Sequence, residues 1–141
     1  MTSKVLILAA MVLLTACRPT SYEQFIRADQ APEGEYVFAL DLADSTAAYD
    51  LSFYTRIDPA LMAAEEPSRT LELEISWKPA ASDSVFLHEA VYIPYGDKAG
   101  SVQLYRSGVR PSPAGKWNLS VKPNEAPEGL RGIGIICKRH D

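Results

Sequence analysis

The sequence predicts an all-β fold, an antiparallel β-sandwich of the jelly-roll or immunoglobulin-like type behind a lipoprotein signal peptide. Three observations predict it: apolar and polar side chains alternate strictly in several segments, clusters of Asp, Ser, Pro and Gly separate these segments, and a short apolar run ends at Cys17. Alternation with a period of two is typical of antiparallel strands that have one buried side. We expect a leader at residues 1–16, a lipidated polar tether at residues 17–33 and a sandwich domain at residues 34–141.

The N-terminal segment has the parts of a secretory signal peptide. Lys4 precedes an uncharged apolar run from Val5 to Leu14, which is too short for a membrane-spanning helix of roughly 20 residues. The run ends in Leu-Thr-Ala-Cys, which resembles the bacterial lipobox, whose cysteine receives the lipid and begins the mature chain. We therefore expect the acyl chains on Cys17 to anchor the protein in a membrane. No acidic cluster of the kind associated with surface export follows Cys17, which favours the periplasmic face of an outer membrane.

Composition excludes some classes of partner. The chain has 14 Lys and Arg against 18 Asp and Glu, and this acidic balance offers no basic surface for nucleic acid. Without residues 1–16, 125 of the 141 residues remain, which is enough for one domain with its own core. If Cys17 carries lipid, Cys137 has no disulfide partner, and we expect it to be a small buried hydrophobic residue.

Four segments alternate clearly and are predicted to be half-buried strands. They are residues 34–42, 48–57, 70–77 and 116–123. Their apolar positions include Trp77 and Trp117, so we expect both indoles in the core.

Two further segments are predicted to be strands with less regular faces. Residues 84–96 are apolar at both parities, as expected for a central strand that is covered on both sides. Residues 130–138 carry Gly132 and Gly134 on one face, where a close neighbour or a bulge could lie. A helical turn is expected at Pro59–Glu66, inside a connection.

No set of residues indicates catalysis or a metal centre. His88 is expected to be a partly buried, hydrogen-bonded residue within a strand, and His140 lies at the end of the chain, where disorder is common. Neither has a second ligand at metal-binding spacing. The aspartates Asp41, Asp44 and Asp50 could supply oxygens to calcium, but turn formation explains them equally well. We therefore predict a protein without enzymatic activity and without a cofactor.

Aromatic residues are the remaining candidates for a binding surface. Tyrosines bring contact area at little entropic cost, and they can stack on sugars or anchor protein contacts. The candidates for contact with a partner protein or a glycan are Tyr54, Tyr92, Tyr95 and Tyr105. Tyr54 falls at the otherwise polar parity of its segment, so we expect it to be exposed on the outer face. Residues 106–116 are expected to form a solvated loop, or otherwise a rim that meets an acidic partner.

Three parts of the chain resemble the gliding-motility lipoprotein GldH family of Bacteroidetes. They are the lipobox cysteine, the segment YDLSFYTRI at residues 49–57, and the ending GKWNLSVKPNEAPEGLRGIGIICKR at residues 115–139. The chain departs from the family after Arg56, where Ile-Asp-Pro replaces a Tyr-Pro-Tyr-Asn-like stretch. The resemblance implies a non-enzymatic component of a cell-envelope machine, and it carries over no catalytic residue.

Two hypotheses about function follow. The leading one is a membrane-anchored, non-catalytic binding or scaffold component of the cell envelope that contacts other envelope proteins. The alternative is a carbohydrate-binding lipoprotein, which an aromatic platform of two or more tyrosines on one sheet face would favour. A glycan hydrolase with a carboxylate pair is a third, less favoured hypothesis.

Overall fold

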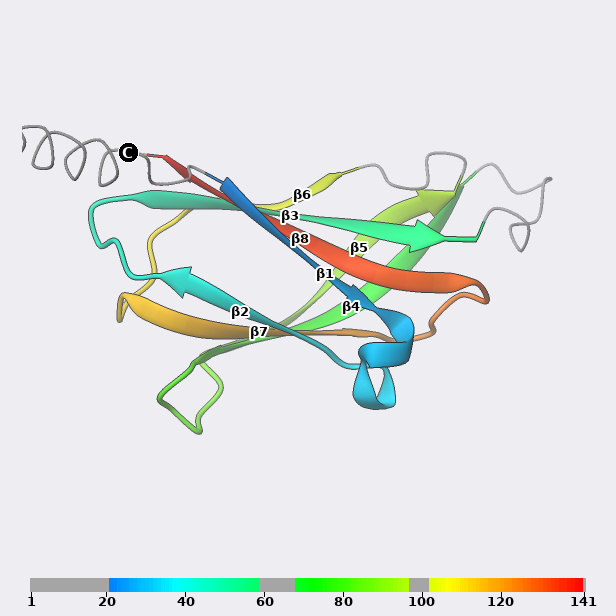
Figure 1. The fold of residues 1–141 in the computed structure, drawn as a ribbon, viewed down its shortest axis with the longest axis horizontal. Coiled ribbons are helices and arrows are strands. Elements are labelled where there is room, and N and C mark those ends of the chain that lie inside the picture. The colour runs from blue at the N-terminus through cyan, green and yellow to red at the C-terminus, as the bar shows by residue number, and fades with distance from the viewer. Residues whose placement is uncertain (1–20, 59–67, 97–101, 141) are drawn as a thin grey trace, which may run out of the picture.

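The computed structural model describes residues 21–58, 68–96 and 102–140 and shows two four-stranded antiparallel sheets packed face to face (Figure 1). The leader at residues 1–16, the lipidation site Cys17 and the expected turn at Pro59–Glu66 lie outside the described residues. The elements are, in chain order, β1 (Ser21–Arg27), η1 (Ala28–Gln30), η2 (Pro32–Gly34), β2 (Tyr36–Leu42), β3 (Ala48–Ile57), β4 (Ser68–Pro79), β5 (Leu87–Gly96), β6 (Gln103–Val109), β7 (Gly115–Pro123) and β8 (Leu130–His140).

The strand order identifies the sandwich as a jelly roll. One sheet has the order β1-β8-β3-β6 and the other has the order β2-β7-β4-β5. Each strand therefore pairs with its counterpart counted from the other end of the chain: β1 with β8, β2 with β7, β3 with β6, and β4 with β5. A long antiparallel hairpin that rolls over on itself produces this order, which is the jelly-roll arrangement. The predicted β-sandwich is confirmed, and the topology selects the jelly roll over the immunoglobulin-like alternative.

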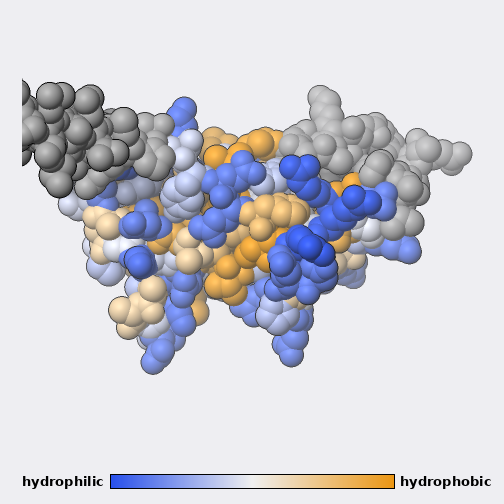
Figure 2. All heavy atoms as spheres, viewed as in Figure 1, coloured by the Kyte–Doolittle hydropathy of each residue, from blue (hydrophilic) through white to orange (hydrophobic). Residues whose placement is uncertain are grey.

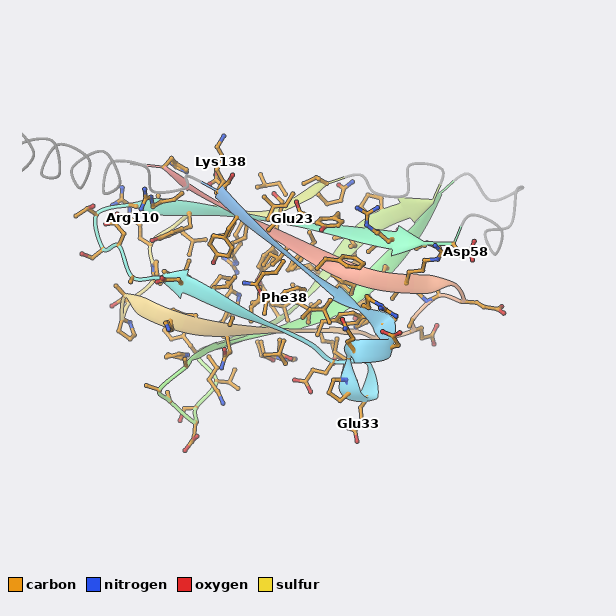
Figure 3. All side chains as sticks on the ribbon, viewed as in Figure 1. Glu23, Glu33, Phe38, Asp58, Arg110 and Lys138 are labelled. Carbon is orange, nitrogen blue, oxygen red and sulfur yellow. The ribbon has the colours of Figure 1, made fainter. Side chains whose placement is uncertain are left out.

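The core lies between the two sheets, as the alternation predicts. Along β2, buried and exposed residues alternate without exception, and Phe38 is fully buried between the sheets (Figure 3). Trp77 and Trp117 are both in the core. Burial of each large apolar side chain contributes roughly 1.5–3 kcal/mol relative to exposure. Cys137 is buried and free, as expected, and burial raises the pKa of its thiol, so this cysteine is a packing residue.

The expected tether at residues 17–33 is wrong for its C-terminal part. Ser21–Arg27 forms strand β1 and pairs with β8 along its whole length, and two short 3₁₀ turns follow it. Tyr22 and Ile26 pack against the core from this strand. The segment is short and mostly polar, so its alternation is weak, and only the pairing with β8 gives it a place in the sheet. The folded domain therefore includes Ser21–Gly34.

The second correction concerns the edges of the sheets. The segment at residues 84–96 was predicted to be a central strand, but β5 starts at Leu87 and lies at the edge of its sheet. Its apolar residues at both parities include exposed ones, such as Tyr92. The predicted loop at residues 106–116 is also wrong at its start, because β6 includes residues 106–109 and forms the edge of the other sheet.

Apolar and polar residues are unevenly distributed on one face of the molecule. On the face that Figure 2 shows, hydrophobic residues gather along the middle, where the sheets meet, and hydrophilic residues cover much of the rest. Within the described ranges, no helix is long and apolar enough to cross a bilayer.

Candidate functional site

A cleft opens where the edge strands β5 and β6 face each other across the sandwich. We call it the β5–β6 cleft; its volume is about 410 Å³. Its walls come from the end of β4, the start of β5, the second half of β6 and the β6–β7 connection. The lining residues are Trp77, Phe86, Leu87, Arg106, Ser107, Gly108, Val109, Arg110, Pro111, Ser112 and Trp117.

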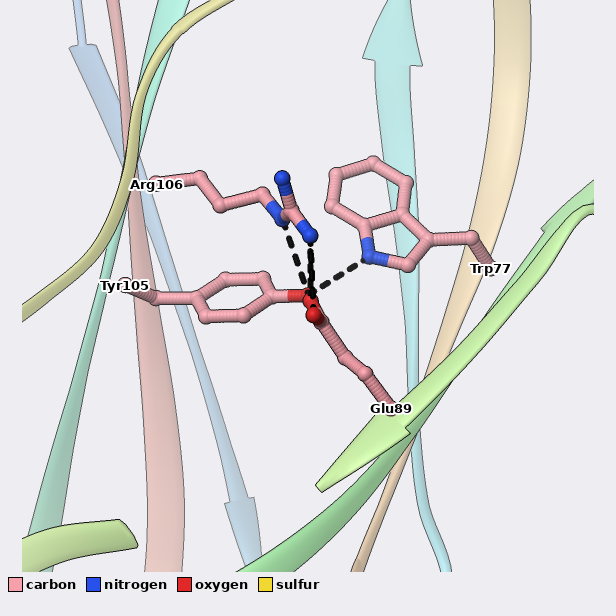
Figure 4. Close-up of polar contacts among 4 residues, drawn as sticks. All are labelled: Trp77, Glu89, Tyr105 and Arg106. Carbon is pink, nitrogen blue, oxygen red and sulfur yellow. Dashed lines mark hydrogen bonds and ion pairs between the residues drawn. The ribbon is translucent and has the colours of Figure 1, made fainter. Parts of the chain in front are cut away.

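A polar cluster joins the two sheets beside this cleft (Figure 4). Glu89 reaches across from β5, and Arg106 on β6 donates to it through Nε at 3.1 Å and through Nη2 at 2.8 Å to each carboxylate oxygen. Tyr105 also donates its hydroxyl proton to Glu89 and accepts the indole N–H of Trp77 at 2.8 Å. The cluster therefore connects β4, β5 and β6 through charge-assisted hydrogen bonds.

The electrostatics of the cluster fix its protonation states. Burial alone would raise the pKa of Glu89, but the hydrogen bonds from Tyr105 and Arg106 outweigh it, so the pKa lies below its usual value. Burial and donation to Glu89 raise the pKa of Tyr105 to about 12. Glu89 is thus a carboxylate at neutral pH, with its oxygens already occupied, and it is poorly suited to act as a general acid.

Arg106 retains capacity for a ligand. Its guanidinium lies over the Tyr105 ring, 5.5 Å from the centroid, and its Nη1 points away from Glu89 (Figure 4). The side chain is 41% exposed. The cleft can therefore offer the Nη1 amino group of Arg106, with its two N–H donors, beside its aromatic walls.

The aromatic side of the cleft includes one exposed ring. Phe86 precedes β5, is 67% exposed, and contacts Trp117 edge to face with ring centroids 5.5 Å apart. Trp117 in turn makes an edge contact with Trp77 at 6.1 Å. The two tryptophans form the buried floor, and Phe86 forms a wall that a partner can reach.

Asp50 on β3 holds the β6 wall in place. Its Oδ1 accepts the backbone N–H of Gly108 at 2.8 Å and the hydroxyl of Ser107 at 3.0 Å, and it lies 3.1 Å from Nε2 of His140. These hydrogen bonds, first that from Gly108, lower the pKa of Asp50 to about 2. Gly108 has a φ of +68°, which favours glycine, at a point where the β3–β6 register is irregular.

The three candidate tyrosines whose side chains the structure describes do not form a shared surface. Tyr92 is 66% exposed on β5, as expected, and Tyr105 is turned inward as part of the polar cluster. The side chain of Tyr95 lies outside the described residues. The expectation of an exposed Tyr54 is wrong, because it is only 5% exposed.

Tyr54 is covered although it lies on the outer face of its sheet. Its ring stacks on Phe25 of β1 with centroids 5.9 Å apart, and its hydroxyl donates to Glu23. Burial and this hydrogen bond raise the pKa of Tyr54 to about 12. The ring fills the space beside Gly134, so the expectation of a close neighbour at the glycines is confirmed. Without Tyr54, the described tyrosines provide no aromatic platform, which counts against the carbohydrate-binding alternative.

The other candidate polar residues make local contacts. His88 makes the expected hydrogen bond, between its Nδ1 and Ser76 Oγ, which lie 2.7 Å apart, but it is exposed. His140 is the last residue of β8 and is opposite Ala48 of β3. The aspartates considered for calcium serve separate turns: Asp41 accepts from the Ala43 N–H, and Asp44 from the Thr46 N–H. Within the described part of the chain, no group of three or more His, Cys, Asp or Glu residues could hold a metal ion.

Sequence reasoning missed the ion pair between Glu89 and Arg106 beside the cleft. Glu89 and Arg106 are 17 residues apart, and only the sheet order brings them together. One signal was available: Glu89 falls between Leu87 and Val91, at a parity that faces the core. A carboxylate at such a position requires a partner, which would have directed attention to a nearby arginine.

Comparison of the chain with protein-family models, with curated proteins and with solved structures gives no significant match.

Proposed function

We propose that this chain is a non-catalytic binding or scaffold component of the cell envelope, anchored through Cys17 and similar in role to the gliding-motility lipoproteins that it resembles. In this proposal the jelly roll presents the rims of the β5–β6 cleft to another envelope protein. The lipobox-like N-terminus supports the anchoring, and the periplasmic face of an outer membrane is the proposed location.

The distribution of exposed apolar side chains supports this proposal most strongly. Among the described residues, five of the six exposed large hydrophobic residues lie on or next to the edge strands β5 and β6. Each of these strands pairs with only one other described strand, so each has an edge that no described strand covers. A free edge with apolar side chains is a surface for pairing with an extended segment of a partner. The five residues are Val85, Phe86, Tyr92, Val102 and Leu104.

The polar cluster fits a binding role better than a catalytic one. Glu89 accepts hydrogen bonds from Tyr105 and Arg106, so the cluster holds the two edges at a fixed separation. A rigid scaffold of this kind reduces the entropy that is lost when a partner binds. Phe86 would provide the aromatic anchor at the centre of such a contact, with Arg106 at its rim.

Chemical crosslinking in intact cells tests this proposal. The lipidated protein is isolated after crosslinking, in parallel with a form that carries a cleavable secretory leader and Cys17→Ser. We expect a defined set of envelope proteins with the anchored form and their loss with the unanchored form. Recovery of the protein alone in both cases would contradict a scaffold role.

A further inference from the structure

A second pocket lies at the far end of the sandwich from the β5–β6 cleft. The cleft adjoins Arg110, and the second pocket adjoins Asp58 and its ion-pair partner Arg131; Figure 3 labels Arg110 and Asp58 at opposite ends of the molecule. We call it the arginine pocket; its volume is about 410 Å³. Its lining residues are Phe25, Arg27, Ala28, Asp29, Arg56 and Arg131.

The register of the β1-β8-β3 sheet places two of the arginines on either side of one glycine. Gly132 of β8 is opposite Arg27 of β1 and also opposite Arg56 of β3. Residues that lie directly opposite one another on neighbouring strands share a face of the sheet, so Arg27 and Arg56 are on the same face. Their Cα atoms are two strand spacings apart, which is about 9–10 Å. Gly132 has no side chain to fill the gap, and a Cβ there would overlap the Phe25 ring, which forms the floor.

A β-bulge brings the third arginine to the same pocket. The β3–β8 register passes from Arg56 opposite Gly132 to Ile57 opposite Leu130, so Arg131 is the extra residue on β8. In a regular strand Arg131 would point to the face opposite that of Gly132. A bulge redirects such a side chain, and Arg131 lines the pocket together with Arg27 and Arg56.

The pocket has more positive than negative charge. Its lining contains three guanidinium groups and one carboxylate, that of Asp29, in a chain whose net charge is −4. Arg27 pairs with Asp29, and Arg131 pairs with Asp58 at 3.0 Å. Arg56 lies over the rings of Phe25 and Tyr54, at 5.6 and 5.8 Å from their centroids, and is exposed. Within the described residues, Arg56 has no carboxylate partner, so its donors are available to an anion.

We propose that the arginine pocket binds a phosphate ester. Guanidinium groups bind phosphate through paired, charge-assisted hydrogen bonds, and one phosphate can accept from several arginines at once. The pocket is larger than a phosphate ion, and the Phe25 ring offers an apolar surface to the group that carries the phosphate. A sugar phosphate and a phospholipid headgroup present the same chemistry. This site is separate from the proposed partner contact and does not depend on it.

Nuclear magnetic resonance of arginine side chains tests the proposal on the full-length chain in an uncharged detergent. Inorganic phosphate, glucose 1-phosphate and short-chain phosphatidic acid are the probes. We expect saturable shifts of the Nε–Hε signals of Arg27, Arg56 and Arg131 with each probe. Tighter binding of glucose 1-phosphate would identify a sugar phosphate as the ligand class, and tighter binding of phosphatidic acid would identify a phospholipid headgroup.

Two matched variants remove one positive charge each. Arg56→Gln is expected to weaken binding at least tenfold, and Arg110→Gln, an exposed arginine at the opposite end, less than twofold. Arg27→Gln provides a second pocket variant in case Arg56→Gln alters the fold, which the amide spectrum would show. Absence of saturable shifts with all probes, or equal weakening by pocket and control variants, would overturn the proposal.

Discussion

The ring of Tyr54 on β3 lies directly over Gly134 on β8, on the outer face of the sheet, and leaves no room for a Cβ on the glycine. Gly134 lies opposite Tyr54 on one neighbouring strand and opposite Phe25 on the other, β1. The Phe25 ring stacks on the Tyr54 ring. One glycine therefore allows two aromatic residues from the neighbouring strands to pack over the middle strand. This packing ties the N-terminal strand β1 to the rest of the domain.

Gly134→Ala is expected to destabilise the fold by about 2 kcal/mol, because the new methyl group overlaps the Tyr54 ring, and overpacking of this kind costs roughly 1–3 kcal/mol. Urea unfolding measures the change in free energy. In a Tyr54→Ala background the same substitution is expected to have almost no cost, since the clash is gone. An equal cost in both backgrounds would show that the Tyr54 contact is not the cause.

Tyr105→Phe is expected to lower the free energy of unfolding by roughly 1–3 kcal/mol, because it leaves the buried indole N–H of Trp77 without its acceptor and removes a donor to Glu89. The matched control is Tyr92→Phe, where the tyrosine is 66% exposed; a change within about 0.5 kcal/mol is expected there. Similar effects of the two substitutions would contradict the structural role of the polar cluster.

The hydrogen bonds that Asp50 accepts from Gly108 and Ser107 are expected to weaken only at strongly acidic pH. The pKa of Asp50 is lowered from 3.8 to about 2, so its contribution to stability is fully present above pH 3.8 and is lost as the pH falls through about 2. Carbon-13 titration of the carboxyl group gives the pKa, and hydrogen exchange at the Gly108 amide reports the loss of its hydrogen bond. The Asp50→Ala variant, which lacks the acceptor for the Gly108 N–H, should show fast Gly108 exchange at every pH. If the Asp50 carboxyl group titrates near its ordinary pKa, the proposed stabilisation of β6 by Asp50 is wrong.

Cys17→Ser is expected to remove the lipidated, processed form from the membrane fraction and to leave the apolar leader uncut by the lipoprotein peptidase. Cell fractionation and the mass of the mature N-terminus measure both effects. The control is Cys137→Ala, which removes the other cysteine and should leave membrane attachment unchanged. Normal processing of the Cys17→Ser variant would remove the basis for the anchoring proposal.

The alternation of apolar and polar residues correctly predicted the strands that bury one face in the core. In such a strand every second side chain points between the two sheets, which gives a period of two. β2 and β7 follow this rule closely. β1 was missed because Ser21–Arg27 is short and polar, and its pairing with β8 joins residues from opposite ends of the chain. Parity correctly placed Tyr54 on the outer face but could not show that Phe25 covers it there.

The candidate sites depend on long-range pairing, which local sequence does not encode. Glu89 and Arg106 meet only because β5 and β6 are the edges on the same side of the two sheets. The arginine pocket requires the register of three strands and the bulge at Arg131. In contrast, the core positions of Trp77, Trp117 and Cys137 follow from parity alone.

Site-specific photo-crosslinking in intact cells tests the central claim, that the edges beside the β5–β6 cleft bind an envelope protein. A photoreactive residue replaces Phe86 at the cleft in one strain and Val37 on β2, an edge strand at the other side of the sandwich, in another; both residues are exposed. We predict a crosslink to one defined envelope protein from position 86 and none from position 37. Crosslinks to the same protein from both positions, or from position 37 alone, would contradict the claim.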